Sequence, residues 1–495
     1  MLMPEPDAGL LARKAEFTAA LRAIVPGEGV IEAASELRAY ESDGLTAYAC
    51  SPLAVVLPET VEQVSRVLAY CSSVGLKIVP RGAGTSLSGG ALPIADGVVL
   101  GLGKFNRILE IDYENRCAVV QSGVTNLAIS QAVAARGFYY APDPSSQIAC
   151  TIGGNVAENS GGVHCLKYGM TTNNLLGLEM VLADGEIVRL GGKQFDAGGF
   201  DLMGVVTGSE GLLGVVTEVT VRILPKPAVQ RAALLGFRSI EAAGACVGAV
   251  IAAGIIPAGM EIMDRASIHA AEAFVSSGYP LDVEAVLIVE LDGQAEDVDH
   301  LIPRVLEIAA ANGACSSRCS ESEAERLSFW AGRKAAFPAI GRISRDYYCM
   351  DGTIPRRALP EVLSRMAELA SEFGLRVANV FHAGDGNLHP MVLYDANVPS
   401  ELERAEALGA EILKLCVAVG GVLTGEHGVG VEKRDLMEVQ FTSADLDQQQ
   451  RLKCAFDEAS LLNPGKVFPQ LCRCAELGRV HVHGGRPRFP DLPRF

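Results

Sequence analysis

The stretch KIVPRGAGTSLSGG, residues 77–90, carries an apolar strand straight into a loop in which four of the last ten residues are glycine. Glycine adopts positive φ and lets a ligand approach the backbone closely, and successive backbone amides in such a loop form an anion-binding concavity. The stretch lacks the helix and acidic residue of a Rossmann fingerprint and the Gly-Lys-Ser/Thr of a Walker loop. We therefore expect residues 81–90 to bind a pyrophosphate in a different type of fold.

Two further glycine-rich segments follow. They are PDPSSQIACTIGGNVAENSGGVHCLKYG at 142–169 and TGSEGLLGVVTEV at 207–219. A single glycine-rich loop is a plain turn about as often as it is a ligand-binding loop, so one alone is weak evidence. Three of them in one domain, each next to a strand, predict a large nucleotide with an extended contact surface.

The pattern around these loops predicts an α/β first half and an α+β second half, with a boundary near Pro225 and Pro227. In the first half we expect strands at 55–57, 77–79, 98–100, 108–111, 118–121 and 214–224, helices from 61 and over 126–135, and a hairpin over 178–190. In the second half we expect helices at 240–252, 297–311, 357–373, 401–419 and 444–460, and strands at 285–291, 376–382 and 389–394.

The composition excludes several classes of protein. A net charge of -17 argues against nucleic-acid binding, because an acidic surface repels phosphates. No stretch has the length and hydrophobicity of a membrane span, and the N-terminus lacks the order of a secretion signal, so we expect a cytoplasmic protein. The 13 cysteines show neither a disulfide framework nor the run that an iron–sulfur cluster needs.

Two motifs of the second half supply metal-ligand chemistry. In HAGDGNLH, His382 ends an apolar strand and His389 begins the return strand, so the two imidazoles can come close. GEHGVG, residues 425–430, adds Glu426 and His427 from a separate loop. Two histidines and one carboxylate leave open positions on a zinc or manganese ion, which predicts His382, His389 and Glu426 as ligands. His427 is the expected general base.

A cation for an anionic substrate is expected in FWAGRKAAF, residues 329–337, which offers Arg333 and Lys334. Arginine can bind a carboxylate with two parallel hydrogen bonds. A solvated helix face is the alternative. On its own, the histidine set also suits a metallohydrolase; beside three nucleotide-binding loops, its metal has the task of holding a hydroxy acid.

The three glycine-rich segments resemble the FAD-binding domain of the vanillyl-alcohol oxidase family, with motifs in the expected order over roughly residues 20–470. Within it, the chain most resembles the members that oxidise 2-hydroxy acids such as glycolate, D-lactate and D-2-hydroxyglutarate. The resemblance implies an α+β fold, an FAD-binding domain of vanillyl-alcohol oxidase (PCMH) type followed by a C-terminal α+β cap domain. It also implies the metal and base roles given above, and a carboxylate contact from Arg333.

The implied domain bounds are an N-terminal helical segment at 1–48, an FAD-binding domain at 49–228, a substrate domain at 229–462 and a tail at 463–495 that returns to the FAD-binding domain. Some relatives attach FAD through a histidine in the first loop; Thr85 stands near that position here, so we expect non-covalent FAD. The expected FAD-binding residues are Arg81, Gly82, Ala83, Gly84, Thr85, Ser86, Gly89, Gly90, Pro142, Asp143, Ser146, Gly153, Gly154, Asn155, Asn159, Ser160, Gly161, Gly162, Gly208, Glu210, Gly211, Gly214, Val216 and Asn463.

The resemblance finally implies a reaction and partners. Phe337 and Met391 are apolar where relatives with larger substrates carry polar side chains, which favours glycolate, or D-lactate in an enzyme that acts alone. We expect electrons to pass to a second flavin-type subunit and an iron–sulfur subunit, or to a quinone-linked acceptor at the inner membrane. The tail with Cys472, Cys474, His481 and His483 is a candidate docking surface, and a packed tail without such a role is the favoured alternative. A non-catalytic flavin-binding assembly subunit is an alternative, but the complete ligand set argues against it. An ether-lipid synthase of the same fold is another alternative, and the absence of a membrane-binding helix in the sequence argues against it.

Overall fold

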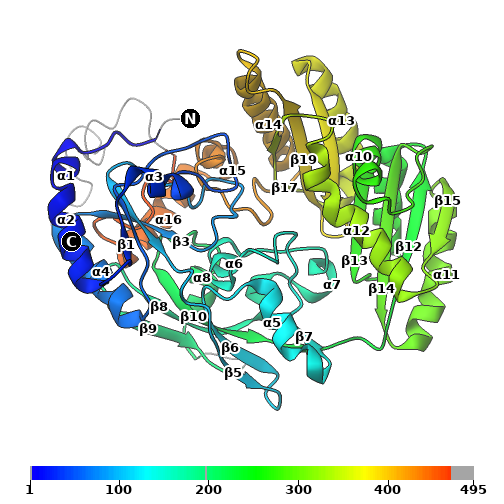
Figure 1. Cartoon of the computed structure of the whole chain (residues 1–495). Helices are drawn as coiled ribbons and strands as arrows, with labels where there is room; N and C mark the ends of the chain where they lie inside the picture. The colour runs from blue at the N-terminus through cyan, green and yellow to red at the C-terminus, as the bar shows by residue number, and fades with distance from the viewer. Residues whose placement is uncertain (1–2, 195–197, 470–495) are drawn as a thin grey trace.

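Two lobes face each other across a central cavity in the computed structural model, which describes residues 3–194 and 198–469 (Figure 1). The first lobe holds the three glycine-rich segments. The second lobe is built around one large sheet. A short connection at residues 223–229 leads from one lobe to the other.

The first sheet of the first lobe has the order β1-β2-β4-β3, and β2, β4 and β3 run parallel. Its strands are Val30–Ile31, Ala54–Val56, Gly97–Gly101 and Lys77–Arg81, in that order. The central strands are buried on both faces, as parallel sheets usually are. Because β3 ends at Arg81, the loop at 81–90 starts at the carboxyl edge of this sheet.

The second sheet of the first lobe is antiparallel, with the order β5-β6-β10-β8-β9. Its strands are Ile108–Asp112, Cys117–Gln121, Val215–Arg222, Leu175–Val181 and Ile187–Gly191. The expected hairpin is β8–β9, in which Gly185 has a φ of 91° and the Asp184 carboxylate accepts from the Glu186 amide. Asp-Gly is a strong hairpin signal for this reason.

Helices cover both sheets. They are α1 (Ala8–Ala12), α2 (Lys14–Ile24), α3 (Ala34–Leu37), α4 (Val61–Val74), α5 (Asn126–Val133), α6 (Ile152–Glu158), α7 (Cys165–Tyr168) and α8 (Leu202–Val206), with a small β7–β11 pair at Phe138–Tyr139 and Leu224–Pro225. In the described ranges, 3-10 turns lie at Arg38–Tyr40, Ala134–Arg136, Thr171–Asn174, Arg356–Ala358 and Arg434–Leu436.

The second glycine-rich segment is more helical than its composition suggests. Thr151 accepts a hydrogen bond from the Gly154 amide and begins α6, and Asn159 ends it with a φ of 52°. Such caps satisfy the free amides of a short helix. The segment therefore presents a helix N-terminus, rather than only a loop, to the cavity.

The second lobe holds an eight-stranded antiparallel sheet with the order β15-β12-β14-β13-β18-β19-β16, and β17 also pairs with β19. The strands are β12 (Val229–Phe237), β13 (Gly259–Asp264), β14 (Ala285–Gly293), β15 (Ala314–Cys319), β16 (Asp346–Cys349), β17 (Gly352–Thr353), β18 (Arg376–His382) and β19 (Asn387–Tyr394). The helices are α9 (Ile240–Ala252), α10 (Arg265–Val275), α11 (Ala295–Ala311), α12 (Glu323–Ile340), α13 (Leu359–Phe373) and α14 (Glu401–Ala418).

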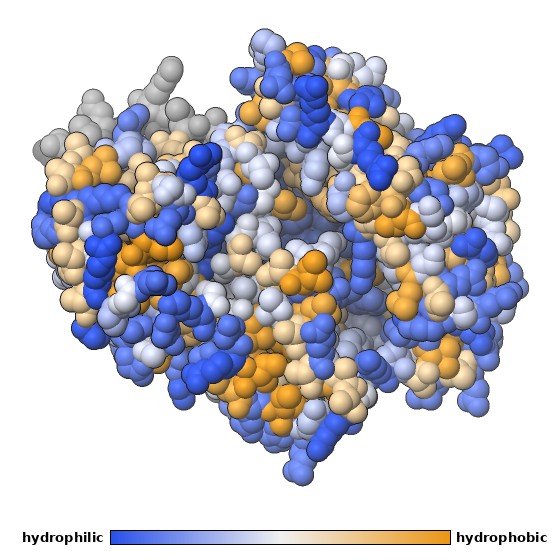
Figure 2. Space-filling model, in the orientation of Figure 1, coloured by the Kyte–Doolittle hydropathy of each residue, from blue (hydrophilic) through white to orange (hydrophobic). Residues whose placement is uncertain are grey.

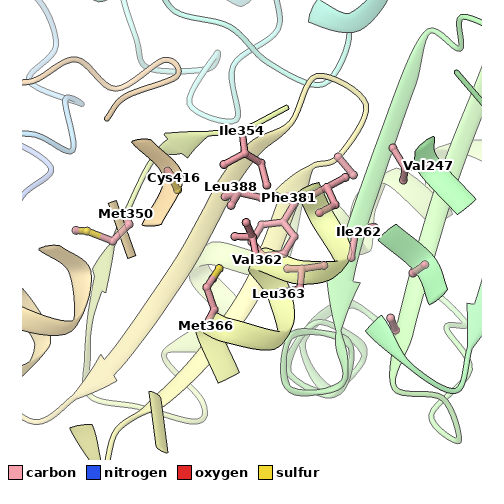
Figure 3. Close-up of a cluster of buried hydrophobic side chains, with 14 of the residues drawn as sticks. Val247, Ile262, Met350, Ile354, Val362, Leu363, Met366, Phe381, Leu388 and Cys416 are labelled. Atoms are coloured by element: carbon pink, nitrogen blue, oxygen red, sulfur yellow. The ribbon is translucent and has the colours of Figure 1, made fainter. Parts of the chain in front are cut away.

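Both faces of this sheet are covered by helices, which makes two cores. Ile262 and Phe381 point to the face packed by α9, α11, α13 and α14, where Val362 and Met366 meet them (Figure 3). Met263 and Val380 point to the other face, packed by α10 and α12. Successive residues of a strand point to opposite faces of the sheet. The position of a residue along its strand therefore decides whether its side chain can approach the cavity.

The end of the described chain returns to the first lobe (Figure 1, orange and red). Here α15 (Met437–Gln440) and α16 (Ser443–Phe456) follow the second lobe. Lys453 donates to the Leu212 carbonyl over 2.7 Å, and Leu462 forms a bridge with Ile78 of β3. The return thus begins before the expected tail at 463–495, since the amides of Val431 and Glu432 already donate to the Ser88 carbonyl.

No helix in the described ranges is long and apolar enough to cross a membrane. The eleven cysteines within them are free thiols, and Cys315 and Cys319 both lie in β15. The candidate docking residues Cys472, Cys474, His481 and His483 lie outside the described residues.

Candidate active site

One cavity of about 650 Å³ runs from the glycine-rich loops of the first lobe to the histidine motifs of the second. Figure 2 shows the surface hollowed between the two lobes. This volume is in the range of small-molecule and cofactor sites. The expected FAD-binding residues that line it are Arg81, Gly82, Ala83, Gly84, Thr85, Ser86, Gly90, Ser146, Gly153, Gly154, Asn155, Ser160, Glu210, Gly211, Gly214 and Val216.

Glycine is required at several of these positions. Gly84 and Gly211 have φ values of +72° and +73°, where other residues are strained. A Cβ at Gly84 would collide with the Arg81 guanidinium, and one at Gly90 would lie 2.6 Å from Oε1 of Glu158. The loops therefore leave exposed backbone against the cavity, as a large anionic cofactor needs.

Eight of the expected FAD-binding residues do not line the cavity: Gly89, Pro142, Asp143, Asn159, Gly161, Gly162, Gly208 and Asn463. Some of them brace the loops instead. Asn463 donates to the Gly90 carbonyl over 3.0 Å and to the Glu210 carbonyl over 2.6 Å. Asp143 pairs with His164, and the Gly161 amide donates to Glu426 over 3.1 Å.

Sequence reasoning missed several residues of the cavity wall. They are Gly44, Pro80, Leu87, Ala91, Leu102, Ser122, Pro144, Ser145, Ile148, Cys150, Thr151, Ala157, Glu158, Val206, Ser209, Val215, Pro338 and Tyr347. Most of them lie inside the three glycine-rich segments, between residues that were expected to bind FAD. Glu158 carried a signal of its own, as an acidic residue between the glycines of 142–169.

His382 and His389 meet as diagonal neighbours of the β18–β19 hairpin. In its register His382 faces Asn387, and His389 faces Val380. Both imidazoles therefore point to the same face of the sheet, with ring centroids 4.9 Å apart and both residues buried. The hairpin brings the two imidazoles together as expected, although they are not directly opposed.

Glu426 completes this group from the loop between α14 and α15. Its Oε1 lies 3.2 Å from Nε2 of His382 and 3.4 Å from Nε2 of His389. Burial alone would raise the pKa of Glu426, but the three neighbouring histidines lower this pKa to about 2. Glu426 therefore carries a negative charge between the two imidazoles.

Asp351 holds the loop that carries Glu426. It is fully buried, and its carboxylate accepts from the amides of Gly425, Glu426 and His427 at 2.8–3.2 Å. Asp351 and Arg356 stand five residues apart in MDGTIPRR, so Asp351 has two candidate roles: it can cap a backbone turn or pair with Arg356. The structure shows the cap, while Arg356 donates to the Gly384 carbonyl. Burial alone would raise the pKa of Asp351, but interactions with His427, Lys433 and His389 hold this pKa well below its usual value.

A second bridge ties this loop to the first lobe. Glu210 accepts from the amides of Val429 and Gly430, each over 2.7 Å. The carboxylate comes from the third glycine-rich segment. Hence the loop that carries Glu426 and His427 is fixed from both lobes.

His427 lines the cavity and stacks on His389, with centroids 4.8 Å apart and 11° between the ring planes. Burial, together with the nearby positive groups, lowers the pKa of His427 to about 4 despite the Asp351 carboxylate. The imidazole is therefore neutral near pH 7 and can accept a proton.

His382, His389 and Glu426 fit a divalent cation. Their ligand atoms all lie within 4.8 Å of one another, and Asp351, His389 and His427 form a second such group. Nδ1 of His389 is buried and has no hydrogen-bond partner among the described residues. The Glu261 and Glu426 carboxylates, overcoming burial, raise the pKa of His382 well above its usual value, so the group favours positive charge.

The two expected cations of α12 lie in different surroundings. Lys334 is exposed and lines the cavity. Arg333 is 1% exposed and does not line it; its Nε donates to Oε2 of Glu261 over 2.7 Å. Nη2 of Arg333 has no hydrogen-bond partner within the described chain.

The two apolar residues expected to select a small substrate also differ. Phe337 lines the cavity, with its ring 6.1 Å from that of His389. Met391 is fully buried in the core between the sheet and α12. Phe337 thus shapes the cavity directly, whereas Met391 lies behind its wall.

Known proteins match both halves of the chain. The protein family described as FAD binding domain matches residues 52–191. The family described as the C-terminal domain of FAD linked oxidases matches residues 226–467. The chain is 58% identical over 476 residues to glycolate oxidase subunit GlcD of Escherichia coli (strain K12), covering 96% of this chain and 95% of the relative. It is 32% identical to a D-lactate dehydrogenase of Archaeoglobus fulgidus, covering 84% of this chain and 91% of the relative.

Among solved structures, p-cresol methylhydroxylase with its substrate bound superposes with a TM-score of 0.80 at 19% identity, covering 96% of this chain and all of the other. The expected fold class, an FAD-binding domain followed by an α+β cap, is confirmed.

Proposed function

Because the chain belongs to the family of FAD-linked oxidases and is an FAD-dependent 2-hydroxy-acid oxidoreductase, we propose that its substrate is glycolate, which it oxidises to glyoxylate. One observation carries the proposal. A single cavity joins the glycine-rich FAD loops to His389, Glu426, His427 and Lys334. A hydroxy acid in its second half would lie between the cofactor and a neutral imidazole.

Positive charge binds the carboxylate of the substrate. Lys334 supplies it from the cavity wall. Arg333 offers Nη2, a buried donor that lacks a partner among the described residues. A buried hydrogen-bond donor without a partner is energetically costly. A substrate carboxylate that accepts from Nη2 removes this cost, so the hydrogen bond contributes more to binding than one formed by a donor already hydrogen-bonded to water.

His427 takes the hydroxyl proton. Its imidazole is neutral near pH 7, since its pKa is lowered to about 4, and Asp351 fixes the backbone that carries it. His382, His389 and Glu426 would hold the cation. When bound, FAD supplies the two-electron acceptor for the hydrogen on C2, and a divalent zinc or manganese ion supplies positive charge beside the hydroxyl.

Phe337 favours a small substrate. Its ring stands beside His389 where a second carboxylate of a longer acid would need a polar partner. Burying a charge against an aromatic ring is unfavourable. This supports glycolate over D-2-hydroxyglutarate. D-lactate differs from glycolate by one methyl group, so an enzyme that acts alone on D-lactate remains the second candidate.

The relative named as a subunit supports action within a multi-subunit complex. We propose a second flavin-type subunit and an iron–sulfur subunit as partners, which pass the electrons on. Retention of FAD without a covalent bond at Thr85 and a cytoplasmic location also remain predictions.

Anaerobic stopped-flow spectroscopy tests the function. The flavin absorbance should bleach fastest with glycolate, more slowly with D-lactate and least with D-2-hydroxyglutarate, and a chelator should slow the bleaching. Faster bleaching by D-lactate would favour the second candidate. Normal turnover of the assembled complex by Glu426→Gln and His427→Ala variants would instead indicate a non-catalytic assembly subunit.

A further inference from the structure

Glu261 is a fully buried carboxylate outside the cavity wall, and both of its oxygens contact residues of the proposed site. Oε1 lies 2.8 Å from Nδ1 of His382, and Oε2 accepts from Nε of Arg333 over 2.7 Å. The contacts come from two different elements, β18 and α12. One side chain therefore joins the expected metal ligand to the expected substrate cation.

The sheet explains the first contact. Strands β13 and β18 are antiparallel neighbours, and Ile262 faces Phe381. One further step along this register places Glu261 beside His382. Side chains of cross-strand neighbours lie close together because the backbone pairing of the two strands fixes their positions. The pairing of β13 with β18 therefore places Glu261 next to His382.

The contact decides which nitrogen of His382 faces the cation site. Nδ1 lies 2.8 Å from Glu261 and Nε2 lies 3.2 Å from Glu426. When a cation displaces the proton from Nε2, the contact with Glu261 keeps the remaining proton on Nδ1 and leaves Nε2 as the ligand atom. Carboxylates that accept from a ligand histidine fix its tautomer and its ring orientation, and their loss typically lowers metal affinity about 10- to 100-fold.

The second contact compensates the charge of Glu261 and orients Arg333. A buried carboxylate is costly without a partner, and the guanidinium supplies one. Because Glu261 binds Nε, Arg333 keeps Nη2 unpaired among the described residues. That donor is the one which the proposed function assigns to the substrate carboxylate.

We infer that Glu261 is a positioning residue for the oxidation, which presents Nε2 of His382 to the divalent cation and Nη2 of Arg333 to the substrate. This inference rests on the proposed function. It assigns to one buried carboxylate a link between cation affinity and recognition of the substrate carboxylate.

Glu261→Gln tests the inference, because glutamine keeps the shape and removes the charge. We expect the affinity of the flavin-loaded protein for zinc, measured without substrate by competition with a chromophoric chelator, to fall about 10- to 100-fold. The KM for glycolate should rise about tenfold, while the flavin content stays unchanged. Glu261→Asp, which keeps the charge, should recover part of the zinc affinity.

Asp264→Asn is the matched control. Asp264 is a carboxylate on the same strand, but it caps α10 and binds Asn379. This variant should lose stability and keep zinc affinity. Should Glu261→Gln retain flavin but melt too early for titration, the titration is made below its melting temperature, and a zinc affinity equal to that of the parent overturns the inference.

The outcomes separate this inference from the proposed function. If the parent binds zinc and glycolate does not bleach its flavin, the substrate is wrong, yet the zinc measurement on the variants still decides the role of Glu261. Wild-type zinc affinity in folded Glu261→Gln overturns the inference even where glycolate is oxidised. Absence of zinc or manganese binding to the parent overturns it as well.

Discussion

The imidazole of His164 in the first lobe lies 3.2 Å from the Glu290 carboxylate in the second. Its other nitrogen lies 2.9 Å from Asp143. Burial alone would lower the pKa of His164, but the two carboxylates raise this pKa to about 10. Arg326 and Trp330 also donate to Glu290. A protonated histidine thus fastens the two lobes together at a place separate from the loop that Asp351 holds.

His164→Gln should destabilise the protein near neutral pH by about 2 kcal/mol, the typical worth of a hydrogen bond to a charged group. Since the folded pKa is raised, the stabilisation is complete below about pH 6.5 and disappears as the pH rises through about 10. Denaturant unfolding of both proteins between about pH 6 and 10.5 measures the difference. A gap that stays constant with pH would contradict a charged His164.

His427→Ala should slow the bleaching of bound flavin by glycolate about 10²- to 10⁴-fold, the usual contribution of a general base. The flavin content should not change, because the loops of the first lobe remain. Single-turnover stopped-flow spectroscopy measures the rate. His269→Ala, which removes a histidine bonded to the Leu281 carbonyl outside the cavity, is the control and should react normally.

Gly84→Ala should weaken FAD binding about tenfold, because alanine in the left-handed region costs about 1–2 kcal/mol and its Cβ would displace Arg81. Gly75→Ala has nearly the same backbone angle, +70°, but meets open space at the end of α4. It should lose stability and keep FAD affinity. Fluorescence titration of the apoproteins with FAD compares them, and equal affinities would remove Gly84 from the cofactor site.

Lys334→Gln should raise the KM for glycolate about fivefold with little change in kcat, which corresponds to the roughly 1 kcal/mol of a partly exposed ion pair. High salt should reduce the difference, because it screens the lysine. Steady-state kinetics with an artificial electron acceptor measures both constants. Lys414→Gln, on the surface of α14, serves as the control; an unchanged KM in Lys334→Gln would leave the carboxylate to Arg333.

Precipitation with acid should release all of the flavin into the supernatant. Thr85 lines the cavity and has no ring nitrogen to bond with the cofactor. Absorbance spectra of the pellet and supernatant give the answer. Flavin that stays in the washed pellet would show a covalent bond to another residue of the cavity wall.

Many helices, strands and turns of the fold could be predicted from local patterns in the sequence. The cap at Thr60, the turn at Asp184-Gly185 and the apolar periodicity of α4 depend on neighbours in the chain, so they could be predicted. Strand β13 escaped prediction, because Gly259–Asp264 is short and its apolar and polar residues do not alternate regularly. The helix α12 was also missed, although it carries Arg333 and Lys334.

The site was predictable where motifs are compact. HAGDGNLH and GEHGVG gave four residues that the structure brings together: His382, His389 and Glu426 form one group, and His427 stacks on His389. The parts that depend on distant contacts were not predictable. Glu261 lies 121 residues from His382, and only the pairing of β13 with β18 brings them together. The same carboxylate binds Nε of Arg333, which stands 72 residues along the chain, and this contact too is invisible in the local sequence.

The return of the chain to the first lobe has a consequence for biosynthesis. Asn463 and Lys466 both donate to the carbonyl of Gly90, which stands 373 and 376 residues earlier. A nascent chain that ends before them has every glycine of the loop at 81–90 but neither of the side chains that hold its Gly90 carbonyl. Uptake of FAD is therefore expected to follow translation, and fragments that stop short of residue 463 should emerge colourless.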